Sequence, residues 1–336
     1  MATPPQPPRP GIIPLRPLAL GDILDGTVKL IRANPKVTLG LSAIVGVVTG
    51  LPVAIWQAVY APEAGNFFAD PGATQGGPPT STMLGGEVVV TFASLLLTFV
   101  ATALLTGLLI RVLGRAVFGA RTTTREAWAM TRSRVAALLG QTLLVVVVIV
   151  LPVVLVSGSL MVTGVVIDHA GLIFVGGLSV VVWLPYAAFM GTRLALAPAA
   201  LVLENLGPVD GMRRSWRLVR GDSWRVFGIV LLTQILIAIV SGVAAIPFSI
   251  GSMALSAFGA DSGAVTAGAA ILLAIGETVT AMLAYPFTAG VYGLLYADRR
   301  MRTEAFDLEL QTAAARPGES SIDDLWQPRQ ANPPQP

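Results

Sequence analysis

Six apolar stretches, each long enough to cross a lipid bilayer, dominate this sequence of 336 residues. A membrane-spanning helix needs about 20 mostly apolar residues, so the sequence predicts an all-α integral membrane protein with six transmembrane helices. Residues 263–276 are also apolar, and we expect them to form an external segment before the sixth helix; the alternative is that they extend it. The predicted helices cover residues 37–60, 88–110, 136–157, 172–192, 226–250 and about 277–297.

The composition excludes a soluble globular protein. Hydrophobic residues make up 54% of the chain and charged residues 12%, whereas an average soluble domain carries about 25% charged residues. The sequence contains one histidine, His169, and no cysteine, so it has no disulfide framework and no thiolate metal site. We therefore expect no cofactor, no bound metal ion and no catalytic residues.

The basic residues are distributed asymmetrically among the connections between the apolar stretches. Residues 61–87, 157–171 and 251–276 contain none of the 22 Lys and Arg residues. Cytoplasmic loops of membrane proteins carry an excess of Lys and Arg. Since the number of predicted spans is even, the sequence predicts that both termini lie in the cytoplasm.

The two ends of the chain differ in composition from the apolar region. Residues 1–17 are rich in proline and are predicted to be disordered. Residues 18–302 form the predicted membrane domain, and residues 303–336 are predicted to be a cytoplasmic, largely disordered tail. Residues 322–326 have the form of a short docking motif, but a disordered tail with an isolated Trp326 is the favoured interpretation.

A short motif recurs before the third and the fifth apolar stretch. Each copy has the pattern Arg-x-x-Trp-x-x-x-Arg, with a glycine eight residues after the last arginine, and the N-terminal segment fits the pattern loosely through Arg32 and Gly40. The sequence therefore predicts three pseudo-repeated units, each a cytoplasmic amphipathic helix followed by a transmembrane hairpin. The units cover about residues 18–111, 112–200 and 201–302.

The amphipathic helices present basic residues on one face and apolar residues, including tryptophan, on the other. This pattern suits the inner membrane interface, where arginine lies near anionic lipid phosphates. One interpretation is lipid headgroup recognition or docking of a protein partner; the favoured alternative is that these helices only orient the hairpins. The candidate lipid- or partner-facing residues are Trp128, Arg125, Arg132, Trp216, Arg213, Arg217, Arg220, Lys29 and Arg32.

Three acidic residues, Glu87, Asp168 and Glu277, each precede a basic residue by about one span length. We expect them at the outer N-termini of helices that run inward, where the helix dipole stabilises a carboxylate. The alternative is that the three acids line an outer vestibule that binds a cation or a polar substrate, because ionisable residues within a membrane are often functional.

The N-terminal sequence resembles the start of a known family. The segment IPLRPLALGDILDG at residues 13–26, followed by IRANPK at residues 31–36, is similar to actinobacterial multi-spanning proteins labelled glycerophosphoryl diester phosphodiesterase membrane domain. Enzymes with that label carry a separate catalytic barrel with a histidine pair and carboxylate metal ligands, and this sequence has no such barrel. The resemblance implies a bacterial plasma-membrane protein tied to lipids or the envelope, without phosphodiesterase activity.

Two functions from different classes follow from these features. The leading prediction is a non-enzymatic, lipid-associated scaffold or accessory subunit in cell-envelope or membrane-lipid metabolism. Its expected partners are anionic lipid headgroups of the inner leaflet and a membrane or cytoplasmic protein, but no nucleic acid. The alternative is a transporter or lipid flippase that uses the outer carboxylates and helices kinked by proline, namely Pro52, Pro152, Pro185, Pro247 and Pro286.

Overall fold

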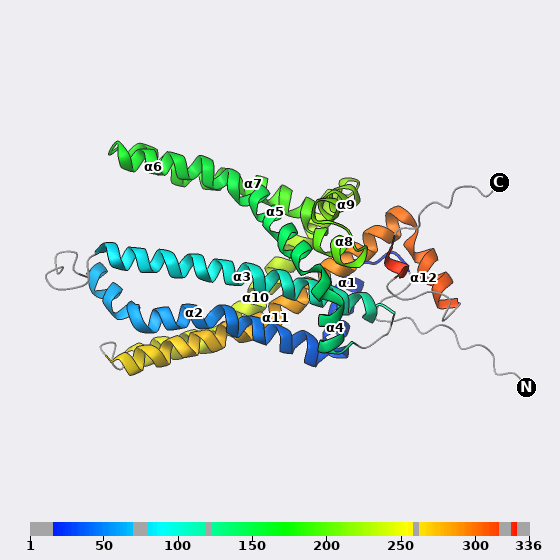
Figure 1. Ribbon diagram of the computed structural model, residues 1–336, viewed down its shortest axis with the longest axis horizontal. Helices are drawn as coiled ribbons and strands as arrows, with labels where there is room; N and C mark the ends of the chain where they lie inside the picture. The colour runs from blue at the N-terminus through cyan, green and yellow to red at the C-terminus, as the bar shows by residue number, and fades with distance from the viewer. Residues whose placement is uncertain (1–15, 70–79, 119–121, 258–261, 316–323, 328–336) are drawn as a thin grey trace, which may run out of the picture. The chain divides into compact units, whose positions relative to one another are not determined.

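The computed structural model describes residues 16–69, 80–118, 122–257, 262–315 and 324–327, and this part of the chain is helical, without strands (Figure 1). The all-α prediction is therefore confirmed. The α-helices are α1 (Leu20–Ala33), α2 (Pro35–Ala69), α3 (Thr80–Ala116), α4 (Thr124–Thr131), α5 (Val135–Val153), α6 (Ser159–Val166), α7 (Ala170–Leu194), α8 (Ala197–Leu203), α9 (Pro208–Arg220), α10 (Ser223–Ala257), α11 (Gly263–Glu304) and α12 (Phe306–Ala315). Short 3-10 helices cover Arg132–Arg134 and Asp324–Trp326, and a π-helical turn covers Val154–Gly158.

Six helical segments in the described part of the chain are long and apolar enough to cross a membrane. They coincide with the six apolar stretches of the sequence, so this prediction is confirmed. A short helix precedes the long helices three times, as α1, α4 and α9; the internal repeat itself stays a prediction. The segments are Pro35–Pro52, Ala93–Ala116, Thr124–Gly164, Ala170–Leu203, Ser223–Ala257 and Gly263–Glu304.

The last long helix corrects one expectation. Residues 263–276 are not a separate external segment, because α11 continues through them without a break and is 42 residues long, or roughly 63 Å at 1.5 Å per residue. Its glycines pack rather than interrupt it. A Cβ atom on Gly268 would lie 2.8 Å from the side chain of Leu255, and one on Gly276 would lie 2.9 Å from that of Phe248. Close packing against α10 thus holds this segment helical.

The chain divides into two compact units. Unit 1 contains residues 1–33, 107–233 and 289–336, and unit 2 contains residues 34–106 and 234–288. Unit 1 therefore holds α1, α4 to α9 and α12, while α3, α10 and α11 contribute to both units. Residues 1–15 and 328–336, on which part of the predicted disorder falls, lie outside the described residues.

In unit 1, α1 packs on the C-terminal part of α11. The side chains of Ile23 and Leu30 are buried. A Cβ atom on Gly290 would lie 2.6 Å from the Thr27 side chain, and one on Gly293 would lie 2.8 Å from the Leu113 side chain of α3. The small residues of α11 thus let α1 and α3 approach its backbone closely.

The hairpin of α5, α6 and α7, also in unit 1, contains a proline whose missing hydrogen bond is replaced. Pro152 has no N–H group, so the carbonyl of Val148, four residues earlier, loses its helical partner. The Tyr186 hydroxyl on α7 donates a hydrogen bond to this carbonyl at 2.7 Å, and the π-helical turn begins at Val154, two residues after Pro152. In an apolar environment such replacement is what makes a proline tolerable within a spanning helix.

Residues 303–315 and 324–327, the described parts of the predicted tail, are structured. The helix α12 covers part of it, and Trp326 is 1% exposed. The indole ring packs against Phe306 and Phe118, with centroid distances of 5.1 and 6.0 Å, and its Nε1 donates to the carbonyl of Gly114 at 3.1 Å. A buried indole needs such a partner for its N–H group, and this pairing makes Trp326 part of the core of unit 1.

We expect Gly46→Ala to destabilise unit 2. A Cβ atom on Gly46 of α2 would lie 2.8 Å from the Thr278 Cα atom of α11, and a backbone clash in a packed interface costs about 1–3 kcal/mol. Gly40→Ala in the same helix is the matched control, because nothing lies within 4 Å of its added Cβ atom. Thermal unfolding in detergent checks this. Equal unfolding temperatures for the two variants would contradict the close α2–α11 packing.

Candidate binding sites

A buried ionic network joins α9 and α11 in unit 1 through Glu204. The Glu204 carboxylate accepts hydrogen bonds from Arg214 Nε at 2.9 Å and Arg214 Nη2 at 2.7 Å, and from the Tyr296 hydroxyl. Arg214 also donates to Glu304, and so does Arg300 Nε, at 3.0 Å. The Glu204 side chain is 1% exposed. A carboxylate so deeply buried is stable only when several donors surround it.

The Glu204 network keeps the Arg214 guanidinium positively charged. Burial by itself lowers the pKa of the guanidinium, because it removes water from the charged form. The hydrogen bonds that Arg214 donates to Glu304 and Glu204 outweigh burial and raise its pKa above the ordinary value. Arg214 is therefore a structural cation.

Asp298 of α11 organises a second buried cluster in the same unit. Its side chain is fully buried and accepts hydrogen bonds from the Leu18 N–H group at 2.8 Å, Arg225 Nη1 at 2.5 Å and Arg302 Nε at 2.9 Å. Arg225 and Arg302 also donate to the Leu18 carbonyl, at 2.9 and 3.0 Å. One carboxylate thus fixes the chain before α1 to the ends of α10 and α11.

Arg299 completes this region, since it donates to the Leu218 carbonyl at 3.0 Å and to Asp222 at 2.8 Å. Sequence reasoning treated the arginines at the end of α11 only as markers of the cytoplasmic side, and it missed Glu204 and Asp298. The alternation of acids and bases in the segment DRRMRTE, residues 298–304, is the signal that indicates internal pairing.

The sequence-predicted basic and tryptophan candidates all lie in unit 1, on α1, on α4 and the turn after it, and on α9. Two of them form ion pairs: Lys29 with Asp25 at 2.7 Å and Arg213 with Asp210 at 3.8 Å. Trp216 is half-buried. The others are exposed, namely Arg32, Arg125, Trp128, Arg132, Arg217 and Arg220.

Arg193, at the end of α7, forms a stack with two aromatic rings. Its guanidinium carbon lies 5.2 Å from the centroid of Phe189 and 5.1 Å from that of Trp216, distances typical of cation–π contacts. The two rings are themselves edge-to-face at 6.0 Å. The Arg193 Nε and Nη1 atoms are buried and donate to no described residue. The stack therefore holds a positive charge in place without neutralising it.

This stack borders two cavities in unit 1. Phe189 and Arg193 line a cavity of about 680 Å³, together with Arg220 and Trp224 at the junction of α9 and α10. Trp216 and Arg217 of α9 line a second cavity, of about 1170 Å³, whose wall also includes residues of α5 and α7. Arg217 and Arg220 form no ion pair within the described part of the chain. In both cavities, aromatic rings lie beside arginines that have no counter-charge among the described residues. The Arg193 stack and the two cavities that it borders are therefore a candidate site for an anionic ligand with an apolar body.

The three acids fall in different parts of the chain. Asp168 is exposed in unit 1, beside the start of α7, whereas Glu277 belongs to unit 2, and the Glu87 side chain lies outside the described residues. The expected capping role of Glu277 is wrong, because α11 begins at Gly263 and places Glu277 well inside the helix. The dipole effect acts only within the first turn.

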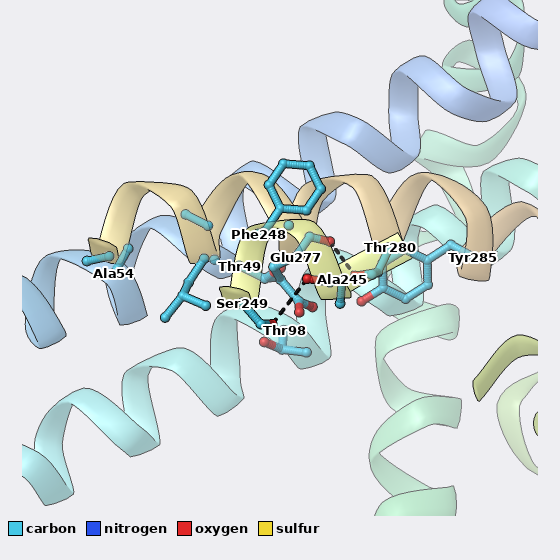
Figure 2. Close-up of a pocket in the computed structure, with 14 residues that line it drawn as sticks. Thr49, Ala54, Thr98, Ala245, Phe248, Ser249, Glu277, Thr280 and Tyr285 are labelled. Carbon is cyan, nitrogen blue, oxygen red and sulfur yellow. Dashed lines mark hydrogen bonds between the residues drawn. The ribbon is translucent and has the colours of Figure 1, made fainter. Parts of the chain in front are cut away.

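Glu277 lines a cavity of about 460 Å³ within unit 2 (Figure 2). Its wall is formed by α2, α3, α10 and α11, and Figure 2 shows the labelled side chains around it. The polar lining residues other than Glu277 are Thr49, Thr98, Ser249, Thr280 and Tyr285. Within the described residues, no group of three or more His, Cys, Asp or Glu side chains is placed to hold a metal ion.

The fold and these sites define a class: an all-helical protein with six helices able to cross a membrane and with charged clusters at the helix ends. The chain belongs to the family described as Domain of unknown function (DUF7847), whose model matches residues 18–295. No curated protein and no solved structure matches the chain.

We expect Glu204→Gln to destabilise unit 1 strongly. The substitution leaves Arg214 and Arg300 without a buried counter-charge, and breaking such a pair costs about 3 kcal/mol or more. Asp210→Asn is the matched control, because its pair with Arg213 is exposed and contributes about 0–1 kcal/mol. Thermal unfolding of both variants in the same detergent measures the difference. A Glu204→Gln protein as stable as Asp210→Asn would show that the network is not needed for folding.

Proposed function

We propose that this chain is a non-enzymatic, multi-pass membrane protein that binds anionic lipid headgroups at the inner membrane interface. It would act there as a scaffold or accessory subunit in cell-envelope or membrane-lipid metabolism, with a protein partner docking on the same basic surface. The proposal places both termini in the cytoplasm of a bacterial cell, in keeping with the basic residues on one side of the spans and with the N-terminal resemblance. It includes no catalytic activity.

The observation that carries the proposal is the contrast between two sets of arginines in unit 1. Arg214 and Arg225 are neutralised by the buried carboxylates of Glu204 and Asp298, and Arg299 by the half-buried carboxylate of Asp222. Arg193 keeps two buried donors without partners, and Arg217, which follows Trp216 on α9, has no ion pair among the described residues. A protein this poor in charge retains uncompensated cations where a ligand or the membrane supplies the anion.

The chemistry of the neighbouring side chains favours a lipid over a small anion. Trp224 is 85% exposed, and it lines the same cavity as Phe189, Phe227 and Arg193. Tryptophan is enriched at membrane interfaces because its ring suits the boundary between acyl chains and headgroups. The basic groups would bind a lipid phosphate, and the aromatic rings would contact the glycerol and upper acyl chains.

We expect the triple variant Arg193→Gln, Arg217→Gln, Arg220→Gln to lose anionic lipid. Each arginine contributes about 1 kcal/mol near an anionic surface, or about fivefold in affinity, so the triple variant should bind about a hundredfold more weakly. Titration of the detergent-solubilised protein with fluorescent phosphatidylglycerol measures this, with phosphatidylcholine as the neutral lipid.

The matched control for this test is Lys29→Gln. Lys29 is basic and exposed, already forms an ion pair with Asp25, and lines neither cavity, so this control should retain lipid. Trp216→Leu should also weaken binding, because it removes one of the two rings that position Arg193. Unchanged phosphatidylglycerol affinity in the triple variant, or equal affinity for both lipids in the wild type, would refute the headgroup site.

A second function, transport or lipid flipping, is favoured by the position of the prolines in unit 2. Pro52, Pro247 and Pro286 lie in α2, α10 and α11, and each is within two residues of a residue that lines the Glu277 cavity. Each proline removes one backbone hydrogen bond, so three of the four helices that form this cavity have a weakened point beside it.

For this second function, wild-type protein in liposomes should move a fluorescent phosphatidylethanolamine between leaflets, and Glu277→Gln should slow that movement at least tenfold. The physical reason is that Glu277 is the charged residue of the cavity. Dithionite quenching of the outer leaflet measures the rate, and Asp168→Asn is the control acid. A rate equal to that of empty liposomes, or one indifferent to Glu277→Gln, would count against transport of this lipid.

A further inference from the structure

The cavity of unit 2 offers hydrogen-bond acceptors to a ligand. Thr49 Oγ1 donates to the Val45 carbonyl at 2.9 Å, Ser249 Oγ to the Ala245 carbonyl at 3.1 Å, and Thr280 Oγ1 to the Glu277 carbonyl at 2.8 Å. Each hydroxyl proton is therefore used within its own helix, while the hydroxyl oxygen still has a lone pair to offer. Three of the polar groups that line the cavity can accept a hydrogen bond from a ligand but have no free proton to give.

The charge of the cavity is also of one sign. Glu277 is the charged residue among those that line it, and no Lys, Arg or His is among them. The Glu277 carboxylate makes no hydrogen bond or ion pair with any residue in the described part of the chain. The Glu277 side chain is exposed, so its negative charge is accessible to a ligand. Because an ionisable group within a long apolar helix favours a partner of opposite charge, the site favours a ligand that brings a positive charge.

The remaining lining is small, apolar and aromatic. Gly50, Ala54 and Ala274 leave room for a ligand, and Phe248 and Tyr285 present rings to the same space. The volume of about 460 Å³ lies in the range of small-molecule sites, about 300–1,000 Å³. Aromatic faces attract cations. A single carboxylate does not suit a calcium ion, which takes six to eight oxygen ligands, so an organic cation fits the site better.

We propose that the Glu277 cavity binds a protonated primary amine with a small apolar or aromatic body. The ammonium group pairs with Glu277 and donates its remaining protons to the hydroxyl oxygens of Thr49 and Ser249, while the apolar body lies against Phe248 and Tyr285. This site is independent of the headgroup site, because every residue that lines it belongs to unit 2.

The test uses the full chain in phosphatidylcholine nanodiscs and the probe 2-phenylethylammonium, with binding measured by calorimetry at neutral pH. The neutral analogue 2-phenylethanol and the anion 3-phenylpropionate have similar shapes. We expect the ammonium to bind at least tenfold more tightly than the alcohol and the anion not to bind. Equal binding of ammonium and alcohol, or no binding of the ammonium, would overturn the proposal.

Two substitutions locate the binding. Glu277→Gln should weaken the ammonium at least tenfold while leaving the alcohol unchanged, and Asp168→Asn, an exposed acid of unit 1, should change neither. Gly50→Val keeps the carboxylate but places its Cβ atom 3.6 Å from Glu277 Cγ, so it should block both probes. Should Glu277→Gln fail to fold, Gly50→Val decides: full ammonium affinity in a folded Gly50→Val protein would overturn the proposal.

The lipid titration of the triple arginine variant separates this site from the proposed headgroup site. Loss of ammonium binding in Glu277→Gln with unchanged phosphatidylglycerol affinity supports two independent sites. A wild-type protein that retains ammonium but shows no preference for phosphatidylglycerol refutes the headgroup site alone.

Discussion

The buried carboxylates of Glu204 and Asp298 are the constraint on which unit 1 depends. Each is removed from water and is stable only because arginines and a tyrosine or a backbone N–H group surround it. Removing one partner from such a cluster leaves an uncompensated charge. The clusters therefore fix α9, α10, α11 and the chain before α1 at defined positions. That rigidity, in turn, holds Trp216 of α9 against Arg193.

The same constraint distinguishes arginines that stabilise the fold from arginines that lack a counter-charge. Where the fold needs a cation, it supplies a carboxylate within hydrogen-bond distance, as for Arg214 and Arg299. Arg193 is treated differently, since it is held by the rings of Phe189 and Trp216, which attract a cation but accept no conventional hydrogen bond. A guanidinium positioned in this way keeps its donors for another group, which we propose is a lipid phosphate.

The helices were predictable from sequence because apolar length is a local property, and the six spans agree with six apolar stretches. The sites were less predictable because they depend on tertiary pairing. Arg225 and Arg217 are equally basic in sequence, yet only Arg225 meets a buried carboxylate. Trp326 resembled an isolated residue because two of its partners, Gly114 and Phe118, lie about 200 positions earlier. The continuity of α11 through Gly276 likewise depends on Phe248, which no local pattern reveals.

Unused hydrogen-bonding capacity distinguishes a binding site from a structural cluster in a chain with so few charges. The proline in α5 shows the structural case, because the carbonyl it frees is satisfied by Tyr186 within the same hairpin. The Glu277 cavity is the opposite case: the hydroxyl protons of Thr49, Ser249 and Thr280 are donated within their own helices, and the Glu277 carboxylate meets no described donor. The Arg193 stack has the complementary excess, of donors without acceptors. Opposite excesses in separate units require ligands of opposite charge, so a single anionic or cationic ligand cannot account for both sites.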